Sequence, residues 1–329
     1  MGLFFADSFD HHDGYKIDAR KGWINAGGRA AGRGGTGHSI DCGNTPAMIR
    51  FGSKAHIAVG LAIYPLAFGN QSIHLGDRNG VRIVSIGFNN DGRLWVSSGR
   101  GGTAGGPSSH VSHLRQWAYH ELTAHLLLIS EDPPRWAVDY RAYVNEHLEL
   151  AGRLTPLDLP IPWIELLTLQ GPGGGLGHYR DDIYITDGEV LGDVRIEPLH
   201  PASDGYYADW RPNGGADHYD RVDEALVDDD TTYLEAEAIG AAESHGMAAH
   251  DPGVTAGIFV WLGLRNTLGE AWKTKSILRI SGEDYLGYEA NPADTYKFYG
   301  EGLLVNPATG LAWTDADLDG LELGVVNSA

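Results

Sequence analysis

Cysteine is nearly absent from this chain of 329 residues, which contains Cys42 alone. A single cysteine excludes an intrachain disulfide and any zinc cluster built on cysteine ligands. Cys42 lies in a strand-like stretch, residues 39–43, so we predict a buried, unreactive thiol rather than a nucleophile.

Basic residues are scarce as well. The chain has 24 Lys and Arg against 44 Asp and Glu, a formal net charge of -20. Nucleic-acid binding needs clustered Lys and Arg, so this composition argues against it. The glycine-rich stretch 27–37 has no Lys-Ser or Lys-Thr after its glycines, which excludes a phosphate-binding loop of that type.

Long apolar runs are missing too. No stretch approaches the roughly 20 residues of a membrane-spanning helix, and residues 1–7 lack the basic start and apolar core of a signal peptide. We therefore expect no membrane insertion, and a chain that is made in the cytoplasm without a signal peptide. Coiled-coil heptads and collagen repeats are also absent, so the sequence predicts no particular oligomer number.

Glycine and aromatic residues are plentiful, with 46 Gly and 10% aromatics. Short alternating stretches such as 56–64, 81–88 and 117–128 are separated by turn signals at intervals of about 8–12 residues, a pattern typical of β-sandwiches. The turn 89–92, Asn-Asn-Asp-Gly, predicts a hairpin, because Asn and Gly accept positive φ. Short helical turns are expected only at 220–226 and 314–321, the second capped by Thr314.

The stretch 179–189 organises the chain. Ile183 and Ile185 alternate there with polar residues, a turn-rich run at 171–177 precedes it, and a new strand pattern follows at 190–196. This is the pattern of the last strand of one sandwich followed by the first strand of another. The predicted fold is all-β, with two tandem β-sandwiches, a lectin-like jelly roll at 1–190 and a smaller sandwich at 191–329.

Two motifs of the first domain resemble laminin-G/concanavalin-A-like lectin domains. Residues 117–122 (WAYHEL) and 144–150 (VNEHLEL) look like that family's W-x-x-x-E-L and V-N-G hairpin, with Glu146 where the family has Gly. The resemblance implies a jelly roll in which the first strand, within 5–10, lies beside the last, within 181–185.

The second domain is similar to a module of bacteriophage virion proteins that follows a lectin-like domain, as it does here. Its marks are 191–198 (LGDVRIEP), 218–224 (HYDRVDE), 228–234 (DDDTTYL), 306–314 (NPATGLAWT) and 318–325 (LDGLELGV). The resemblance implies a virion structural protein of the tail or a head decoration, located in the virion with other virion proteins as partners. Particle symmetry makes a homo-oligomer the expected state.

Several acidic residues near the ends of the first domain are candidate ligands for a structural calcium ion. They are Asp7, Asp10, Asp181 and Asp182. They fall on strands expected to be neighbours, and Ca²⁺ takes roughly 6–8 oxygen ligands, so their convergence would suit it. The alternative is that they are solvated turn and edge residues. Apart from this calcium we predict no cofactor. His11 and His12 would reach one transition metal only if they lie in a loop.

Three strand tryptophans are candidates for stacking on sugar rings: Trp95, Trp117 and Trp136. Burial in the sandwich core is the alternative for each. Glycosidases need two carboxylates on the order of 5–10 Å apart across a cleft. Lectin-like glucanases carry them as Glu-x-Asp-x-x-Glu on one strand, a spacing that this sequence lacks. We therefore predict a protein that is not an enzyme.

The function predicted from the sequence is a non-enzymatic bacteriophage virion structural protein for decoration or adhesion, with glycan binding as an option on the first domain. The alternative is a carbohydrate-active enzyme, a glycan hydrolase or lyase on the same sandwich. That alternative requires a groove with carboxyl groups of perturbed pKa. We expect the second domain to anchor the protein to the particle.

Overall fold

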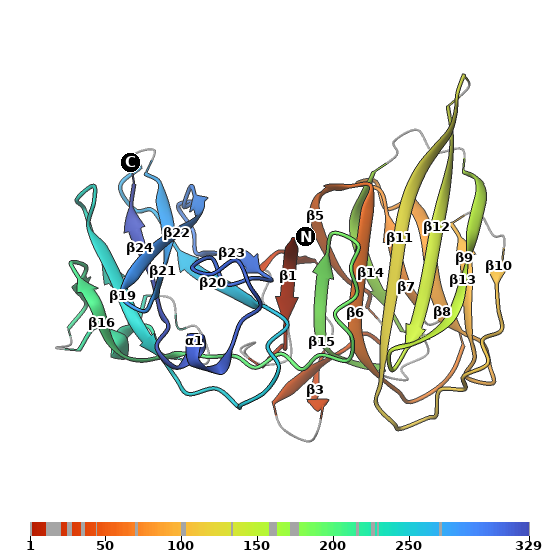
Figure 1. Ribbon diagram of the computed structural model, residues 1–329, viewed down its shortest axis with the longest axis horizontal. Helices are drawn as coiled ribbons and strands as arrows, with labels where there is room; N and C mark the ends of the chain where they lie inside the picture. Colours follow the sequence, from red (N-terminus) through yellow and green to blue (C-terminus); the bar gives the residue numbers. More distant parts are fainter. Residues whose placement is uncertain are drawn as a thin grey trace. The chain divides into compact units, whose positions relative to one another are not determined.

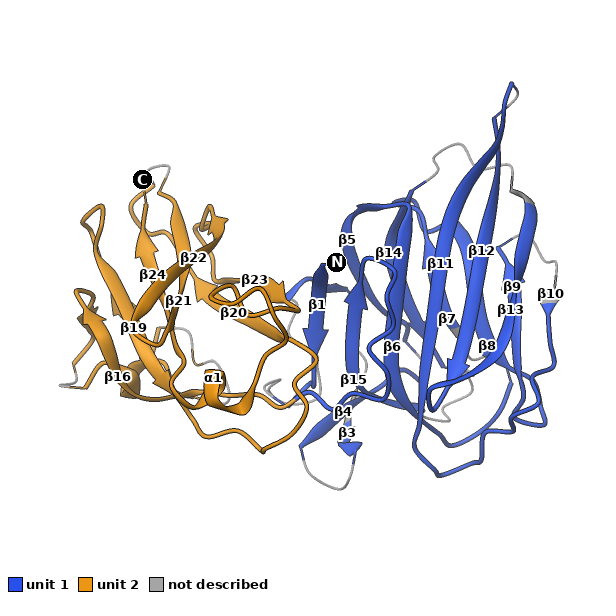
Figure 2. Cartoon of the chain, viewed as in Figure 1, with its two compact units in different colours: residues 1–196 blue, residues 197–329 orange. Residues whose placement is uncertain are grey.

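The computed structural model describes residues 2–10, 21–24, 28–33, 37–43, 45–69, 72–99, 103–132, 134–157, 163–171, 178–214, 217–224, 228, 230–269 and 272–328. The chain forms two compact units, Met1–Ile196 (unit 1) and Glu197–Ala329 (unit 2) (Figure 2). Each is built almost wholly of antiparallel strands (Figure 1). No helix in the described ranges is long and apolar enough to cross a membrane.

Unit 1 contains fifteen described strands. Their bounds are β1 (Leu3–Asp7), β2 (Trp23–Ile24), β3 (Gly28–Ala31), β4 (His38–Asp41), β5 (Ala47–Lys54), β6 (His56–Pro65), β7 (Ser72–Gly76), β8 (Arg82–Phe88), β9 (Leu94–Ser98), β10 (Thr103–Gly105), β11 (Ala118–Glu131), β12 (Pro134–Val144), β13 (His147–Leu157), β14 (Ile164–Gln170) and β15 (His178–Thr186). One sheet, sheet A, has the order β13-β12-β11-β6-β15-β1, with β4 pairing with β15 and β3 with β4. The other, sheet B, has the order β10-β9-β8-β7-β14-β5-β2.

The core of unit 1 lies between these two sheets. Side chains of a strand alternate between its two faces, so every second residue of β6, including Val59 and Leu61, points toward sheet B and is fully buried. Each such aliphatic side chain contributes about 1.5–3 kcal/mol by leaving water. Aromatic rings also bridge the layers: Phe88 of β8 meets the ring of His120 of β11 edge-to-face, with ring centres 5.1 Å apart.

Two hairpins of unit 1 follow their turn residues. The expected turn between β8 and β9 is confirmed: Gly92 has φ +81° and the Asn89 side chain accepts the Arg93 N–H at 2.9 Å. Between β12 and β13 the chain turns at Asn145 and Glu146, with φ of +45° and +69°. Glutamate thus occupies a left-handed position that usually favours glycine, which costs on the order of 1 kcal/mol and calls for a compensating contact.

Unit 2 is a smaller two-layer arrangement. Its elements are β16 (Pro201–Ala208), β17 (Arg211–Pro212), a 3-10 turn (Tyr219–Arg221), β18 (Leu234–Glu235), β19 (Ala242–Met247), β20 (Ile258–Leu264), β21 (Thr274–Ile280), β22 (Glu283–Ala290), β23 (Lys297–Leu303), α1 (Asp315–Asp319) and β24 (Glu322–Asn327). One sheet runs β16-β19-β24-β21-β22. Leu278 of that sheet packs with Trp313, and Ile258 and Leu303 of the β20–β23 hairpin cover them. Thr314 caps α1 through a capping box, as the sequence predicts.

The all-β fold of two tandem sandwiches predicted from the sequence is confirmed, and β1 pairs with β15 as expected. The strand expected at 190–196 is wrong: this segment has no strand structure and belongs to unit 1. Four of its backbone N–H groups, those of Leu191, Gly192, Asp193 and Ile196, donate to side chains, and that of Val194 donates to the Gly192 carbonyl, instead of to a neighbouring strand. The glycine run is described only at Gly171, since 172–177 fall outside the described residues.

Candidate functional site

The face of sheet A that points away from sheet B is the outer face, and it carries the candidate site. On β6 this face presents small residues, Ala58, Gly60 and Ala62, between His56 at one end and Tyr64 at the other. The small residues leave room above the sheet, and larger side chains from β11 and β15 fill it. Tyr184 of β15 lies against Gly60, where a Cβ would fall 2.2 Å from the tyrosine ring.

The middle of the outer face is covered by residues 191–196, the strap. Tyr184 donates its hydroxyl hydrogen to the Glu121 carboxylate and accepts the N–H of Leu191 at 2.7 Å. Glu121 also accepts the N–H of Gly192 at 2.9 Å. Both side chains are buried, 1% exposed each. Burial raises the pKa of Glu121, although the hydrogen bonds from Tyr184 and Gly192 oppose the rise. Two buried polar groups therefore fasten the strap to the sheet.

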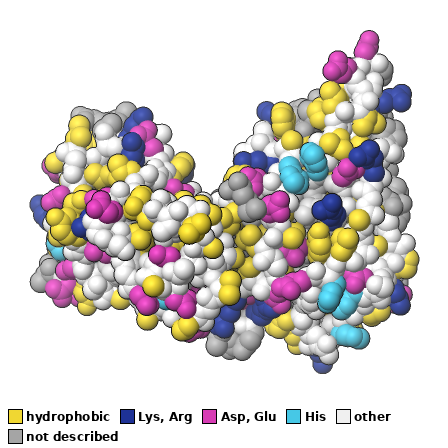
Figure 3. All heavy atoms as spheres, viewed as in Figure 1, with side chains coloured by type: hydrophobic (Ala, Val, Ile, Leu, Met, Phe, Trp, Pro, Cys, Tyr) yellow, Lys and Arg dark blue, Asp and Glu magenta, His cyan; other side chains and the backbone are white. Residues whose placement is uncertain are grey.

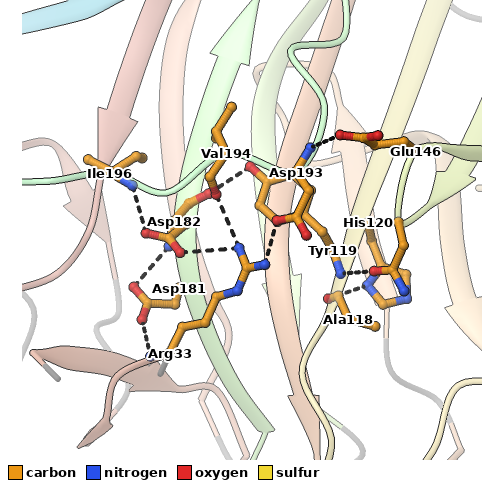
Figure 4. Close-up of polar contacts among 11 residues, drawn as sticks. Arg33, Ala118, Tyr119, His120, Glu146, Asp181, Asp182, Asp193, Val194 and Ile196 are labelled. Atoms are coloured by element: carbon orange, nitrogen blue, oxygen red, sulfur yellow. Dashed lines mark hydrogen bonds and ion pairs between the residues drawn. The ribbon is translucent and has the colours of Figure 1, made fainter. Parts of the chain in front are cut away.

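The far end of the strap is held by Arg33, as Figure 4 shows. Its guanidinium contacts Asp182 at 3.5 Å and Asp193 at 2.5 Å, and donates to the Val194 carbonyl at 3.1 Å. Asp182 accepts the N–H of Ile196 at 2.9 Å. Burial raises the pKa of Asp182, while the Ile196 hydrogen bond and Arg33 lower it. The strap is thus tied by a charged network as well as by Glu121.

The turn residue Glu146 takes part in the same fastening. Its carboxylate accepts the N–H of Asp193 at 3.3 Å (Figure 4). The neighbouring Asn145 side chain accepts the Tyr119 N–H at 2.8 Å. These contacts give a reason for glutamate at a position where the lectin-like motif has glycine, because glycine has no side chain to reach the strap.

A β-bulge on β15 places Asp181 and Asp182 side by side. The register with β6 shifts between Asp181 and Tyr184, and Asp182 has φ +48°. Asp181 accepts the Arg33 N–H at 2.7 Å and the Asp182 N–H at 2.9 Å. Burial and the adjacent Asp182 raise the pKa of Asp181 to about 8. The two carboxyl groups point into the Arg33 network.

The other two candidate calcium ligands have separate partners. Asp7 accepts the Phe9 N–H at 2.9 Å and the indole N–H of Trp23 at 3.0 Å, and Asp10 accepts the His38 N–H at 2.5 Å. Among the described residues, no group of three or more His, Cys, Asp or Glu side chains is placed to hold a metal ion. The calcium site therefore stays a prediction. The alternative at His11 and His12 lies outside the described residues.

The three candidate tryptophans lie in different places. Trp117 immediately precedes β11 and packs on Tyr64, with ring centres 5.3 Å apart. Tyr64 stacks on Tyr179 at 5.7 Å, so the three rings form an aromatic cluster at one end of the outer face. Trp136 lies at the opposite end of the β11–β12 hairpin, beside Leu157, and Trp95 belongs to sheet B. Only Trp117 joins the outer-face site.

The opposite end of the outer face carries a row of polar side chains, the polar row. It runs straight across four neighbouring strands in register, His56, His125, Asp139 and Arg153. The two imidazole rings are 4.8 Å apart, and Arg153 forms a bidentate pair with Asp139 at 2.5 and 2.7 Å. Burial and the neighbouring His125 lower the pKa of His56. Arg141 is exposed on the next outward position of β12.

The outer face therefore has three parts. From His56 to Tyr64 is eight residues of β6, so the polar row and the aromatic cluster are about 26 Å apart at roughly 3.3 Å per residue. The strap lies between them over Gly60. Sequence reasoning missed the polar row, Arg33 and the role of Glu121. The alternation in 117–128 was the available signal, because it places Tyr119, Glu121, Thr123 and His125 on one face.

No family model and no curated protein matches the chain. Among solved structures, it is similar to domain 4 of an extracellular arabinanase from Geobacillus stearothermophilus in complex with arabinotriose, with 13% identity, 57% of this chain and 93% of that chain covered, and a TM-score of 0.38. An endo-β-1,4-glucuronan lyase from the fungus Trichoderma reesei has 10% identity, covers 58% and 97%, and has a TM-score of 0.38. A galectin from Caenorhabditis elegans has 13% identity, covers 45% and 95%, and has a TM-score of 0.31. These neighbours are β-sandwich proteins that bind or act on carbohydrates. At these sequence identities and TM-scores, the comparison assigns no ligand and no activity to this chain.

Proposed function

We propose that this chain is a non-enzymatic bacteriophage virion protein that acts by adhesion or decoration, with a glycan bound on the outer face of unit 1. The observation that favours binding over catalysis is that the buried carboxyl groups of the outer face hold the strap. Glu121 and Asp182 lie under the strap and accept its N–H groups, so they serve as fasteners and do not face a substrate. The virion part of the proposal rests on the sequence marks of the second unit.

The two ends of the outer face supply the chemistry that glycans require. The aromatic cluster offers Trp117, half-buried beside Tyr64, as a flat apolar surface for a sugar ring. The polar row offers imidazole, carboxylate and guanidinium groups as hydrogen-bond partners for hydroxyls. Figure 3 shows His side chains beside Lys, Arg, Asp and Glu side chains on the surface of unit 1. A chain of several sugar rings would be needed to reach both ends.

A glycan array with the purified full chain tests the binding role. We expect Trp117→Ala to lower affinity for the best ligand about tenfold or more, because one sugar-aromatic contact of about 1.4 kcal/mol or more is lost. Trp163→Ala is the matched control, since Trp163 is 41% exposed and leads into β14 of sheet B. Equal affinity losses in the two variants would show that the outer face is not the glycan-binding site.

Electron microscopy of phage particles tests the virion role. The expected density shows two tandem sandwiches on the head or the tail, repeated by the symmetry of the particle.

A second candidate function, a polysaccharide lyase, is favoured by one local observation. Arg141 lies one outward position from both Asp139 and Tyr143 on β12, and His125 is opposite Asp139. A guanidinium that neutralises a uronate, beside groups able to accept and donate a proton, is suited to β-elimination. Incubation with uronate polysaccharides should then give ultraviolet absorbance from an unsaturated product. We expect no such absorbance. If product forms, and if His125→Gln abolishes it, the proposed adhesive function is wrong and the chain is a lyase.

A further inference from the structure

The interior of unit 1 contains an arginine, Arg180, that forms no ion pair with any acidic side chain among the described residues. Arg180 lies on β15 opposite Ile63 of β6 and Ile40 of β4, both core residues, and is 1% exposed. It points between the sheets, away from the strap. A guanidinium keeps its charge under all conditions in which proteins fold, so this positive charge is buried.

Arg180 uses only part of its hydrogen-bonding capacity. Nη2 donates to the Gln170 carbonyl at 2.6 Å. Nε and Nη1 have no hydrogen-bond partner, and no ion pair joins Arg180 to an acidic side chain in the parts of the chain that the structure describes. The carboxylate of Asp41, on the strand paired with this part of β15, instead accepts the N–H groups of Gly43 at 2.8 Å and His178 at 3.2 Å.

The groups around Arg180 do not balance its charge. Burial, together with Arg82 and Arg180, lowers the pKa of His74 to about 4. Burial lowers the pKa of His120 and of His178 to about 3 each, and Arg180 contributes to both shifts. Hydrogen bonds with the Ala118 backbone and the Ala67 backbone, respectively, oppose them. These three imidazoles are therefore neutral at neutral pH and add no charge around Arg180.

The sulfur of Cys42 is an uncharged neighbour of the guanidinium. Burial raises the pKa of this thiol, whereas the charge of Arg180 and a hydrogen bond from Arg180 lower it. The His178 side chain is fully buried beside the Ala67 backbone. Arg180 therefore has an uncharged carbonyl and an uncharged thiol as its acceptors, and no ion pair with a described acidic side chain offsets its charge.

We propose that unit 1 binds a small monovalent anion, a halide such as chloride, between its two sheets on Nε and Nη1 of Arg180. An uncompensated buried charge costs several kcal/mol, which a folded domain cannot easily carry. Water would accept the two hydrogen bonds but would leave the charge unbalanced. A halide accepts the hydrogen bonds and balances the charge, and it needs no geometry beyond converging N–H groups. The inference is independent of glycan binding.

Thermal unfolding of the full chain tests this site. We compare sodium chloride with sodium gluconate at equal ionic strength, because gluconate is too large for the interior. A ligand that binds only the folded state raises Tm with its concentration by mass action. We expect Tm to rise with chloride along a saturating curve, and bromide to act in the same way.

Arg180→Met should lose this chloride-specific rise, and Arg135→Met, at an exposed position of β12, should keep it. Replacing a buried charge by an apolar side chain of similar length is often tolerated, so the Met variant is expected to fold. A chloride-specific rise of equal size in Arg180→Met would overturn the proposal.

Crystals of the unmodified chain grown in sodium bromide give a test that needs no variant. An anomalous bromine peak within hydrogen-bond distance of Nε and Nη1 is expected. Ordered water at both atoms with no anomalous peak would overturn the proposal, even if chloride raised Tm through the protein surface.

Discussion

Arg33→Met should loosen the strap far more than Arg153→Met loosens the polar row. Both arginines contact carboxylates at similar distances, Arg33 with Asp193 at 2.5 Å and Arg153 with Asp139 at 2.5 Å. They differ in what surrounds the pair. Asp182, the second partner of Arg33, has a side chain only 4% exposed, whereas the side chains of Arg153 and Asp139 are 52% and 42% exposed.

Burial sets the size of the expected effect. Removing one partner of a buried ion pair leaves the other charge uncompensated and typically costs about 3–5 kcal/mol. Arg33 is partly exposed, 25% by side chain, and Asp182 keeps the hydrogen bond from Ile196, so we expect about 2–3 kcal/mol for Arg33→Met. Water replaces the lost contact in Arg153→Met, and its effect on stability should be close to zero.

Chemical denaturation combined with hydrogen exchange measures both effects. Unit 1 should unfold at lower denaturant in Arg33→Met, and the amides of Gly192 and Ile196 should exchange faster than in the parent chain. Arg33→Lys keeps the charge but loses the forked donors, so an intermediate result is expected. If Arg33→Met and Arg153→Met change stability equally, or if the strap amides are protected as before, the argument that a buried network holds the strap is wrong.

Three further variants probe the same face. Gly188→Ala should destabilise unit 1 by about 2 kcal/mol and shift the His56 ring resonances, because Gly188 has φ +109° and its Cβ would fall 2.1 Å from the imidazole. Burial raises the pKa of Glu121 above its ordinary 4.5, so the folded state holds that proton more tightly than the unfolded state does. The free energy of unfolding therefore falls as pH rises from about 4.5 through the raised pKa. Denaturation at several pH values should show a shallower fall for Glu121→Gln. Tyr184→Phe removes the hydroxyl that links Glu121 to Leu191 and should cost about 1–3 kcal/mol, with faster exchange of the Leu191 amide; unchanged exchange would count against that link.

The fold could be predicted from local patterns because sandwich strands are set by local alternation. The turn at Asn89 and Gly92 and the cap at Thr314 depend on side chains within four residues of the backbone groups they satisfy. Such contacts are visible in a sequence. The pairing of β1 with β15 needed the lectin-like resemblance, since nothing local joins residues so far apart.

The strap could not be predicted in this way. Its residues alternate as a strand does, which led to a wrong strand at 190–196. What decides the structure is the set of acceptors above the sheet, from Glu121, Glu146, Asp182 and Tyr184, which lie 7 to 71 residues away in sequence. Arg180 was equally hidden, because its position in a strand says which face it points to but not that its charge lacks a partner.

The strap is also the covalent exit from unit 1, so it has a mechanical consequence. A pull applied along the chain beyond Ile196 loads the bond to Asp182 first, then the contacts of Val194 and Asp193 with Arg33. These hydrogen bonds and the ion pair would break one after another, and each can break before the strands of the sandwich are strained. In the adhesive role proposed above, the strap would give extra length under load and close again when the load is removed.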